Sequence, residues 1–177
     1  EDEHRPAIAN GTKRMTQPKY DVCIAVCPPW DVARPPIQLL YLSAYARSKG
    51  LNVRVIDLNI RFYNALADTP SARLWDLNYS SGTTPDRLAR SILENGAAVA
   101  NGAVDEILAT GAPVIGFSVH YRNAPMTNAI ADMIRAGDPQ KKIIYGGPET
   151  GTAFIFGNLS SLGADAFVIG EGEQTLV

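Results

Sequence analysis

The sequence predicts an α/β protein built on a doubly wound, five-stranded parallel sheet. Short runs rich in Val, Ile, Phe and Ala, which are typical of buried strands, alternate along the chain with stretches of helical character. Four of the strand-like runs end in loops rich in glycine, proline and polar residues, namely CPPWDVARPP, GFSVHYRNAP, YGGPE and GEGE. Because the carboxyl ends of parallel strands meet in one crevice where ligands bind, these loops mark a candidate site.

The length and the composition suit one ordinary globular domain. The chain has 177 residues, of which 46% are hydrophobic and 19% charged. A formal net charge of -2 provides no long-range attraction for nucleic acid or for an anionic membrane. The apolar runs are also shorter than the roughly 20 residues that span a bilayer. Nucleic acid and membrane are therefore not expected partners.

The two cysteines, Cys23 and Cys27, fall on or just after the first strand-like run. Residues four apart along one strand are too distant for a disulfide, which favours a reducing compartment, and we expect a cytoplasmic protein. A structural zinc or iron–sulfur site is not expected here, because no further cysteine or histidine lies nearby in the sequence.

The two ends of the chain are assigned differently from its middle. Residues 1–20 are polar and lack an apolar period, so we expect a flexible leader or a cloning remnant, with Met15 as a candidate native start. Residues 21–177 are the expected folded domain. A last helix should only be beginning at residues 173–177, and we therefore expect the chain to be a fragment of a longer one.

The first half of the domain reads as strand, helix, strand. Residues 21–26 form a continuous apolar run, and Pro36 stands where a helix can begin at residue 37. The helix is expected over residues 37–49, with Gly50 placed to end it. Residues 52–59 are the expected second strand.

Residues 60–110 interrupt the alternation and predict a helical insertion. Thr84 and Pro85 have the form of an N-cap and a first helical residue, and they lead into a helix over residues 87–95. A second helix is expected over residues 97–109. Three aromatic residues of the insertion either cover the crevice or anchor the insertion to the core: Phe62, Trp75 and Tyr79.

The alternation then resumes to the end of the chain. The expected elements are a strand at 113–119, a helix at 125–136, a strand at 141–145, a helix at 152–159 and a strand at 164–170. Right-handed crossovers between parallel strands give a flavodoxin-like strand order 2-1-3-4-5 as the simplest architecture. Its switch point lies between the first and third strands, where residues 28–36 and 120–125 should meet.

Two glycine-containing loops are candidate ligand contacts. Gly146-Gly147-Pro148-Glu149 follows a buried strand, so it either lets the backbone approach a ligand or forms a turn that requires a positive φ. Gly170-Glu171-Gly172-Glu173 follows the fifth strand. The two glutamates disfavour a bare phosphate there and favour a neutral polar ligand edge or a domain contact.

Ser118 and His120 lie at the end of the third strand. Ser118 either presents its hydroxyl to the crevice or is a satisfied structural residue. His120 shares its face if the strand continues, and is a candidate metal ligand or base, or a satisfied polar group. The chain contains neither G-x-G-x-x-G after the first strand nor a P-loop, which disfavours classical nucleotide binding.

These residues together resemble a known family. The stretches concerned are Pro28-Pro29-Trp30, Pro36-Ile37-Gln38-Leu39-Leu40-Tyr41-Leu42, Gly50-Leu51-Asn52-Val53, Asp57-Leu58-Asn59, Gly116-Phe117-Ser118-Val119, Gly146-Gly147-Pro148-Glu149 and Gly170-Glu171-Gly172-Glu173. In this order and at strand ends, they resemble the N-terminal cobalamin (vitamin B12)-binding domain of cobalamin-dependent radical SAM enzymes. The resemblance covers nearly all of residues 21–177.

The chain departs from the wider cobalamin-binding family at one motif. That family carries D-x-H-x-x-G after the second strand, S-x-L at the end of the third and G-G after the fourth. Here Asn59 stands where the cobalt-binding histidine would be and Phe62 where the last glycine would be. Family members attached to radical SAM domains commonly lack this histidine, so the departure fits the subgroup and leaves the lower axial ligand unassigned.

The resemblance implies a corrin ring over the carboxyl ends of the strands and a nucleotide tail in the crevice beside Ser118 and Gly146-Gly147. It implies no catalytic residue in this chain, and His120 is the candidate cobalt ligand. A leucine in place of Gly147 is expected to block the tail while the domain stays folded. The candidate cofactor-binding residues are Pro29, Trp30, Arg34, Asn59, Ser118, His120, Tyr121, Arg122, Asn123, Gly146, Gly147, Pro148, Glu149, Gly170, Glu171 and Gly172.

The function implied by the resemblance is that of a cofactor-binding module. Cobalamin would serve methyl transfer or related radical chemistry, and the iron–sulfur cluster and S-adenosylmethionine would belong to a radical SAM domain in the same chain or in a partner. The alternative is a small-ligand sensing or protein-docking domain of the same fold that no longer binds cobalamin. FMN binding is a third possibility, disfavoured by the lack of a Ser/Thr-rich phosphate loop after the first strand.

Overall fold

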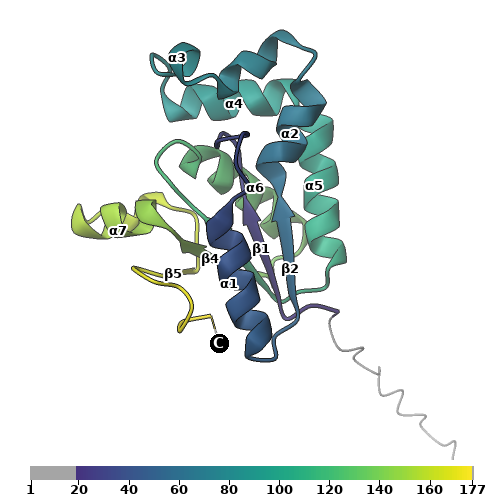
Figure 1. Cartoon of the computed structure of the whole chain (residues 1–177), viewed down its shortest axis with the longest axis vertical. Coiled ribbons are helices and arrows are strands. Elements are labelled where there is room, and N and C mark those ends of the chain that lie inside the picture. The colour runs from purple at the N-terminus through teal and green to yellow at the C-terminus, as the bar shows by residue number, and fades with distance from the viewer. Residues whose placement is uncertain (1–18, 177) are drawn as a thin grey trace, which may run out of the picture.

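The structure is a computed structural model that describes residues 19–176. It contains a five-stranded, all-parallel sheet with the order β2-β1-β3-β4-β5, so the predicted flavodoxin-like α/β fold is confirmed (Figure 1). Residues 1–18 of the predicted leader and Val177 lie outside the described residues. Within residues 19–176, the helices are too short or too polar for any of them to cross a bilayer.

The strands lie close to their predicted positions. They are β1 (Val22–Val26), β2 (Val53–Asp57), β3 (Val114–Ser118), β4 (Lys142–Gly146) and β5 (Ala166–Phe167). β1 is buried along its whole length because β2 and β3 flank it and helices pack on both of its faces. β5 is shorter than the predicted run at residues 164–170 and forms an edge of the sheet.

The helices include elements that the sequence pattern did not reveal. The predicted ones are α1 (Ile37–Ser48), α4 (Pro85–Asn95), α5 (Ala97–Ala109), α6 (Ala124–Gly137) and α7 (Pro148–Ile155). The additional ones are α2 (Leu58–Leu66), α3 (Leu77–Ser80) and the 3-10 helices η1 (Pro70–Trp75) and η2 (Leu159–Ser161).

Two predicted boundaries were wrong for local reasons. The second strand stops at Asp57 because this side chain caps α2, accepting a hydrogen bond from Ile60 N at 3.0 Å. Leu58 and Asn59 are therefore helical. The helix predicted over residues 152–159 begins earlier, because Gly147 turns the chain with φ 102° and Pro148 then occupies the first helical position.

The two faces of the sheet are covered differently. One face packs against α2, α4, α5 and α6 in a large core that includes Ile115, Phe117 and Tyr145. The opposite face packs against α1 in a smaller core around Ile24 and Leu39. Among the described helices only α1 contributes buried residues to this second core, so part of the sheet face beside α1 is left to the loop segment that follows β5.

In the helical insertion, α2, α3 and α4 stand beyond the carboxyl ends of β1 and β2, whereas α5 runs back alongside the sheet (Figure 1). Phe62 is 0% exposed and belongs to the main core, and Trp75 packs against the same core. Tyr79 is 45% exposed, with the Arg73 guanidinium 4.5 Å from its ring centre. Phe62 and Trp75 therefore anchor the insertion to the core and do not cover the crevice.

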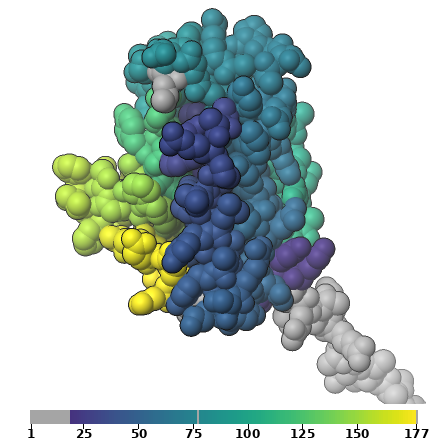
Figure 2. Space-filling view, in the orientation of Figure 1, coloured from purple at the N-terminus to yellow at the C-terminus, as the bar shows by residue number. Residues whose placement is uncertain are grey.

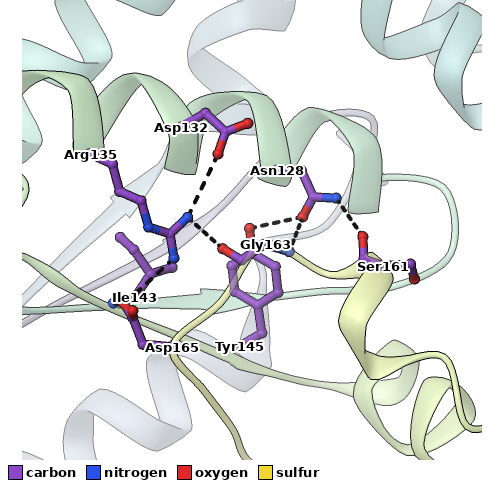
Figure 3. A network of polar contacts seen from close by, with 8 residues as sticks. All are labelled: Asn128, Asp132, Arg135, Ile143, Tyr145, Ser161, Gly163 and Asp165. Carbon is purple, nitrogen blue, oxygen red and sulfur yellow. Dashed lines mark hydrogen bonds and ion pairs between the residues drawn. The ribbon is translucent and has the colours of Figure 1, made fainter.

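A polar network attaches the segment before β5 to α6 (Figure 3). Asn128 Oδ1 accepts hydrogen bonds from the Tyr145 hydroxyl at 3.1 Å and from Gly163 N at 2.9 Å. Arg135 Nη1 donates to Gly163 O at 2.8 Å and its Nη2 lies 3.5 Å from Asp165 Oδ2. These contacts hold the chain in the position from which β5 pairs with β4.

Candidate functional site

A cavity of about 390 Å³ opens between the α1 face of the sheet, α1 itself and the segment that follows β5. It lies toward the carboxyl ends of the strands, where ligands of open α/β sheets bind. Its lining is mainly apolar, and its volume falls within the range of about 300–1,000 Å³ that is typical of small-molecule sites. The lining residues are Ile24, Trp30, Gln38, Leu39, Leu42, Val114, Gly116, Phe117, Ser118, Ile144, Gly146, Gly147, Pro148, Val168, Gly170, Glu171, Gly172, Glu173 and Leu176.

The floor of the cavity is a row of residues from three neighbouring strands. Gly116 of β3 lies in register between Ile24 of β1 and Ile144 of β4. A Cβ atom at Gly116 would meet no heavy atom closer than 4.0 Å, so the missing side chain leaves open space above the sheet. A glycine within a strand often marks a place where a ligand approaches the backbone closely.

Ser118 and Gly146 form the next row of the same floor. They are register partners on β3 and β4, and both line the cavity. No hydrogen bond from the Ser118 hydroxyl to a described residue is found, which leaves this group available to a ligand. A Cβ at Gly146 would lie 3.7 Å from Val168 Cβ, an ordinary contact that would narrow the cavity.

The walls come from α1 and from residues 168–176. The space-filling view shows the C-terminal segment lying against α1, with α7 on the other side of that segment (Figure 2). Leu39 and Leu42 provide apolar wall surface from α1. Glu171 and Glu173 place two carboxylates on the opposite wall, so an anionic ligand group is disfavoured there.

Gln38 contributes an unusual polar atom to the wall formed by α1. Its Nε2 is buried and has no hydrogen-bond partner among residues 19–176. Buried polar groups in folded proteins are nearly always paired, and an unpaired one indicates an absent ligand, ion or water. Gln38 lines the mainly apolar cavity, and neighbouring atoms cover its Nε2, a hydrogen-bond donor that the described residues leave unpaired.

Trp30 and His120 meet at the switch point between β1 and β3. Their ring centres lie 4.3 Å apart, and Asn123 Nδ2 ties the two loops together by donating to Cys27 O at 3.1 Å. Trp30 lines the cavity, whereas His120 does not line it and packs against the Trp30 ring. The predicted meeting of residues 28–36 with residues 120–125 is thus confirmed.

His120 is held as a neutral imidazole. Burial lowers its pKa to about 4, the positive charge of Arg122 acts in the same direction, and the backbone of Pro29 opposes it. Nδ1 accepts a hydrogen bond from Arg122 N at 3.2 Å, so the ring proton belongs on Nε2, which is buried without a partner. The neutral ring of His120 therefore carries its proton on Nε2, and the lone pair of Nδ1 already accepts from Arg122 N.

Asn59 has all of its hydrogen-bonding capacity satisfied by the protein. Oδ1 accepts from Trp30 N at 2.8 Å and from Trp75 Nε1 at 2.7 Å. Nδ2 donates to Trp30 O at 3.3 Å and to Asp31 O at 3.4 Å. Asn59 thus fixes the loop after β1 and joins it to the insertion.

Gly147 is required by the backbone. With φ 102°, an added Cβ would lie 2.7 Å from Val119 O and 3.0 Å from Val119 N. The turn interpretation of this loop is therefore confirmed. The expectation that a leucine at this position would leave the domain folded was wrong, because the side chain would collide with main-chain atoms.

The predicted cofactor-binding residues divide into two groups. Those that line the cavity are Trp30, Ser118, Gly146, Gly147, Pro148, Gly170, Glu171 and Gly172. Those that do not are Pro29, Arg34, Asn59, His120, Tyr121, Arg122, Asn123 and Glu149. In the second group Tyr121 is 67% exposed, and Arg122 donates from its guanidinium to the Ser80 hydroxyl of the insertion.

Sequence reasoning missed two residues of the cavity that matter most. Gly116 was named within a strand and a stretch of the family resemblance but not as a site residue, although a glycine inside an apolar strand run is itself a signal of close approach. Gln38 was likewise named within the first helix and a stretch of the resemblance, but not as a site residue. A polar side chain in the first turn of a helix carries no signal that distinguishes a cavity wall from a solvent-exposed position.

The described residues hold no ready metal centre. No group of three or more His, Cys, Asp or Glu side chains within residues 19–176 is arranged to bind a metal ion. Cys23 and Cys27 are free and buried, so the predicted absence of a disulfide between them is confirmed. Burial raises the pKa of each thiol to about 12, and neither is a nucleophile at neutral pH.

Comparison of the chain with protein-family models, curated proteins and solved structures finds no match. The fold defines the class: this is an α/β protein of flavodoxin-like topology with helices inserted between β2 and β3. The function is therefore inferred from the cavity and its residues.

Proposed function

We propose that this chain is a cobalamin-binding module, similar to the N-terminal domain of cobalamin-dependent radical SAM enzymes. One observation carries the proposal. The apolar cavity lies between α1 and the sheet, follows β3 from Val114 to Ser118, and reaches the carboxyl ends of β3 and β4 beside Ser118 and Gly146. This is the place where the resemblance puts the nucleotide tail of the cofactor.

The residues present fit a flat, neutral, mainly apolar ligand group. Gly116 leaves open space over the sheet at a position where any other residue would project into the cavity. Ile24, Leu39 and Leu42 supply apolar contact. The Ser118 hydroxyl and the Gln38 amide are the polar groups that a bound base and sugar would use.

The corrin ring would lie over the strand ends, where Trp30 and Pro148 border the cavity. Bound cobalamin would supply the cobalt centre for methyl transfer or related radical chemistry. We assign no cobalt ligand in this chain. The amide of Asn59 is saturated, and the free lone pair of His120 accepts from Arg122 N.

The remaining chemistry would belong to a radical SAM domain in the same chain or in a partner. The iron–sulfur cluster of a radical SAM domain takes three cysteine ligands, whereas Cys23 and Cys27 are the chain's two cysteines and both are buried. In this proposal the module binds and orients cobalamin, and S-adenosylmethionine is cleaved elsewhere.

The test is retention of hydroxocobalamin through gel filtration, measured as corrin absorbance in the protein fraction. Wild-type protein should retain about one equivalent. Gly116→Val should remain folded, because its Cβ meets no atom within 4.0 Å, yet it should lose retention because the valine fills the cavity floor.

Gly102→Val is the matched control for this substitution. Gly102 lies exposed on α5, which packs on the other face of the sheet, and a Cβ there meets nothing within 4 Å. This variant should retain corrin like the wild type. A colourless wild-type protein, or equal retention by Gly116→Val and the wild type, would refute the proposal.

A protein-docking module is the second candidate, favoured by exposed apolar side chains on α1 and at the end of α7. Ile37 on α1 is 73% exposed, and Ile155 and Phe156 at the end of α7 are 77% and 76% exposed. Such patches mark interaction sites when they are contiguous. Under this alternative the wild type retains no corrin, and Gly116→Val leaves its interactions unchanged.

A further inference from the structure

Gln38 presents a buried donor that the protein itself leaves unused. The residue is the second of α1 and lines the cavity, and its Nε2 is shielded from solvent without a hydrogen-bond partner. An amide donor kept from water and from protein acceptors is unfavourable in the free protein. Rotation about the broad terminal torsion of the side chain would bring Nε2 from its covered position into the cavity, where a ligand that carries an acceptor would satisfy it.

The electrostatic surroundings limit what kind of acceptor this is. Glu171 and Glu173 lie on the opposite wall of the same cavity, and none of the described residues that line it is an arginine, lysine or histidine. A carboxylate or a phosphate in the cavity would be repelled by both glutamates without a countercharge. A neutral acceptor, such as a ring nitrogen or a sugar oxygen, meets the Gln38 amide without that repulsion.

We propose that Gln38 is a specificity-determining residue of the cavity, whose Nε2 donates a hydrogen bond to a neutral acceptor on the bound group. The inference rests on the proposed function for the identity of the ligand. It adds the chemistry by which the cavity selects that ligand, because an apolar group of the same shape would leave the donor unpaired.

The experiment compares Gln38→Met with Gln140→Met, using hydroxocobalamin as the probe in equilibrium dialysis. Methionine keeps the length of the side chain and removes the donor. Gln38→Met should weaken binding about tenfold, equivalent to about 1.4 kcal/mol. Gln140 is exposed, lies just before β4 and does not line the cavity, so its variant should bind like the wild type.

Thermal unfolding of the ligand-free protein separates a ligand contact from a structural role. Removing an unpaired buried donor should leave Tm of Gln38→Met equal to or above the wild-type value. Gln38→Glu shows whether the ligand accepts or donates the hydrogen bond at this position. A third carboxylate facing an acceptor should weaken binding more than methionine does.

Three results would overturn the inference while leaving the proposed function intact. They are unchanged affinity of Gln38→Met, a lower Tm together with lower affinity, or tighter binding by Gln38→Glu, which would show that the ligand donates at this point. Failure of the wild-type protein to bind hydroxocobalamin would instead remove the proposed function, and this inference with it.

Discussion

The side-chain amide of Asn59 pairs with both main-chain polar groups of Trp30, accepting from its N–H at 2.8 Å and donating to its carbonyl at 3.3 Å. The same Oδ1 also accepts from Trp75 Nε1 at 2.7 Å. One buried residue of α2 therefore connects the loop after β1, which borders the cavity, to the helical insertion. Asn59 acts through the loop that it holds.

Asn59→Ala should destabilise the protein by about 2–4 kcal/mol, because it leaves the main chain of Trp30 and the indole N–H of Trp75 without partners. Urea unfolding followed by far-UV circular dichroism measures the change. Asn64→Ala is the control, since Asn64 is exposed on the same helix and should shift stability by less than about 0.5 kcal/mol. Equal effects of the two substitutions would contradict the central role of Asn59.

Gly147→Ala should cost at least about 2 kcal/mol of stability. The residue has φ 102°, and the new Cβ would lie 2.7 Å from Val119 O, so either the turn or β3 must shift. The comparison is Gly151→Ala on α7, where a Cβ meets nothing within 4 Å and where alanine should stabilise the helix by about 0.5–1 kcal/mol. Urea midpoints of the two variants should move in opposite directions, and a shift in the same direction would show that the Gly147 turn tolerates a side chain.

The burial of His120 predicts a pH dependence of stability. Its pKa falls from the ordinary value of 6.5 to about 4 in the folded protein. Between these values the unfolded chain binds a proton that the folded chain does not, so stability should decrease as the pH falls from about 6.5 to about 4. Unfolding midpoints measured across this window should show the slope in the wild type and a weaker slope in His120→Gln. Parallel profiles would place the titration on another group.

The order of the strands and of helices α1, α4, α5, α6 and α7 followed from pattern alone, whereas helix α2 and several boundaries did not. Residues 52–59 read as one strand because Val53 and Val55 alternate with Arg54 and Ile56. The cap formed by Asp57 ends the strand, and a single acidic residue within such a run has no unambiguous interpretation. Helix α7 was predicted late because the positive φ of Gly147 made Pro148 its first residue.

The candidate site was predicted in part. Ser118 and Gly146 were expected beside a crevice and line the cavity, since both follow from the rule that ligands bind at strand ends. Asn59 was expected at the cofactor because of its place in a motif, and the structure shows its polar atoms already paired. A motif position says which residue stands there, but the partners of that residue depend on segments far away in the chain.

The sequence by itself determined the α/β class and the strand order, because alternating apolar runs with right-handed crossovers allow few other arrangements. Only the tertiary structure decided that a cavity exists. It requires Gly116 to lie between Ile24 and Ile144, which come from strands far apart in sequence, and it requires α1 to set Gln38 and Leu39 against residues 168–176. Strand register and helix placement are set by packing of the whole domain, and no local pattern encodes the space that such packing leaves open.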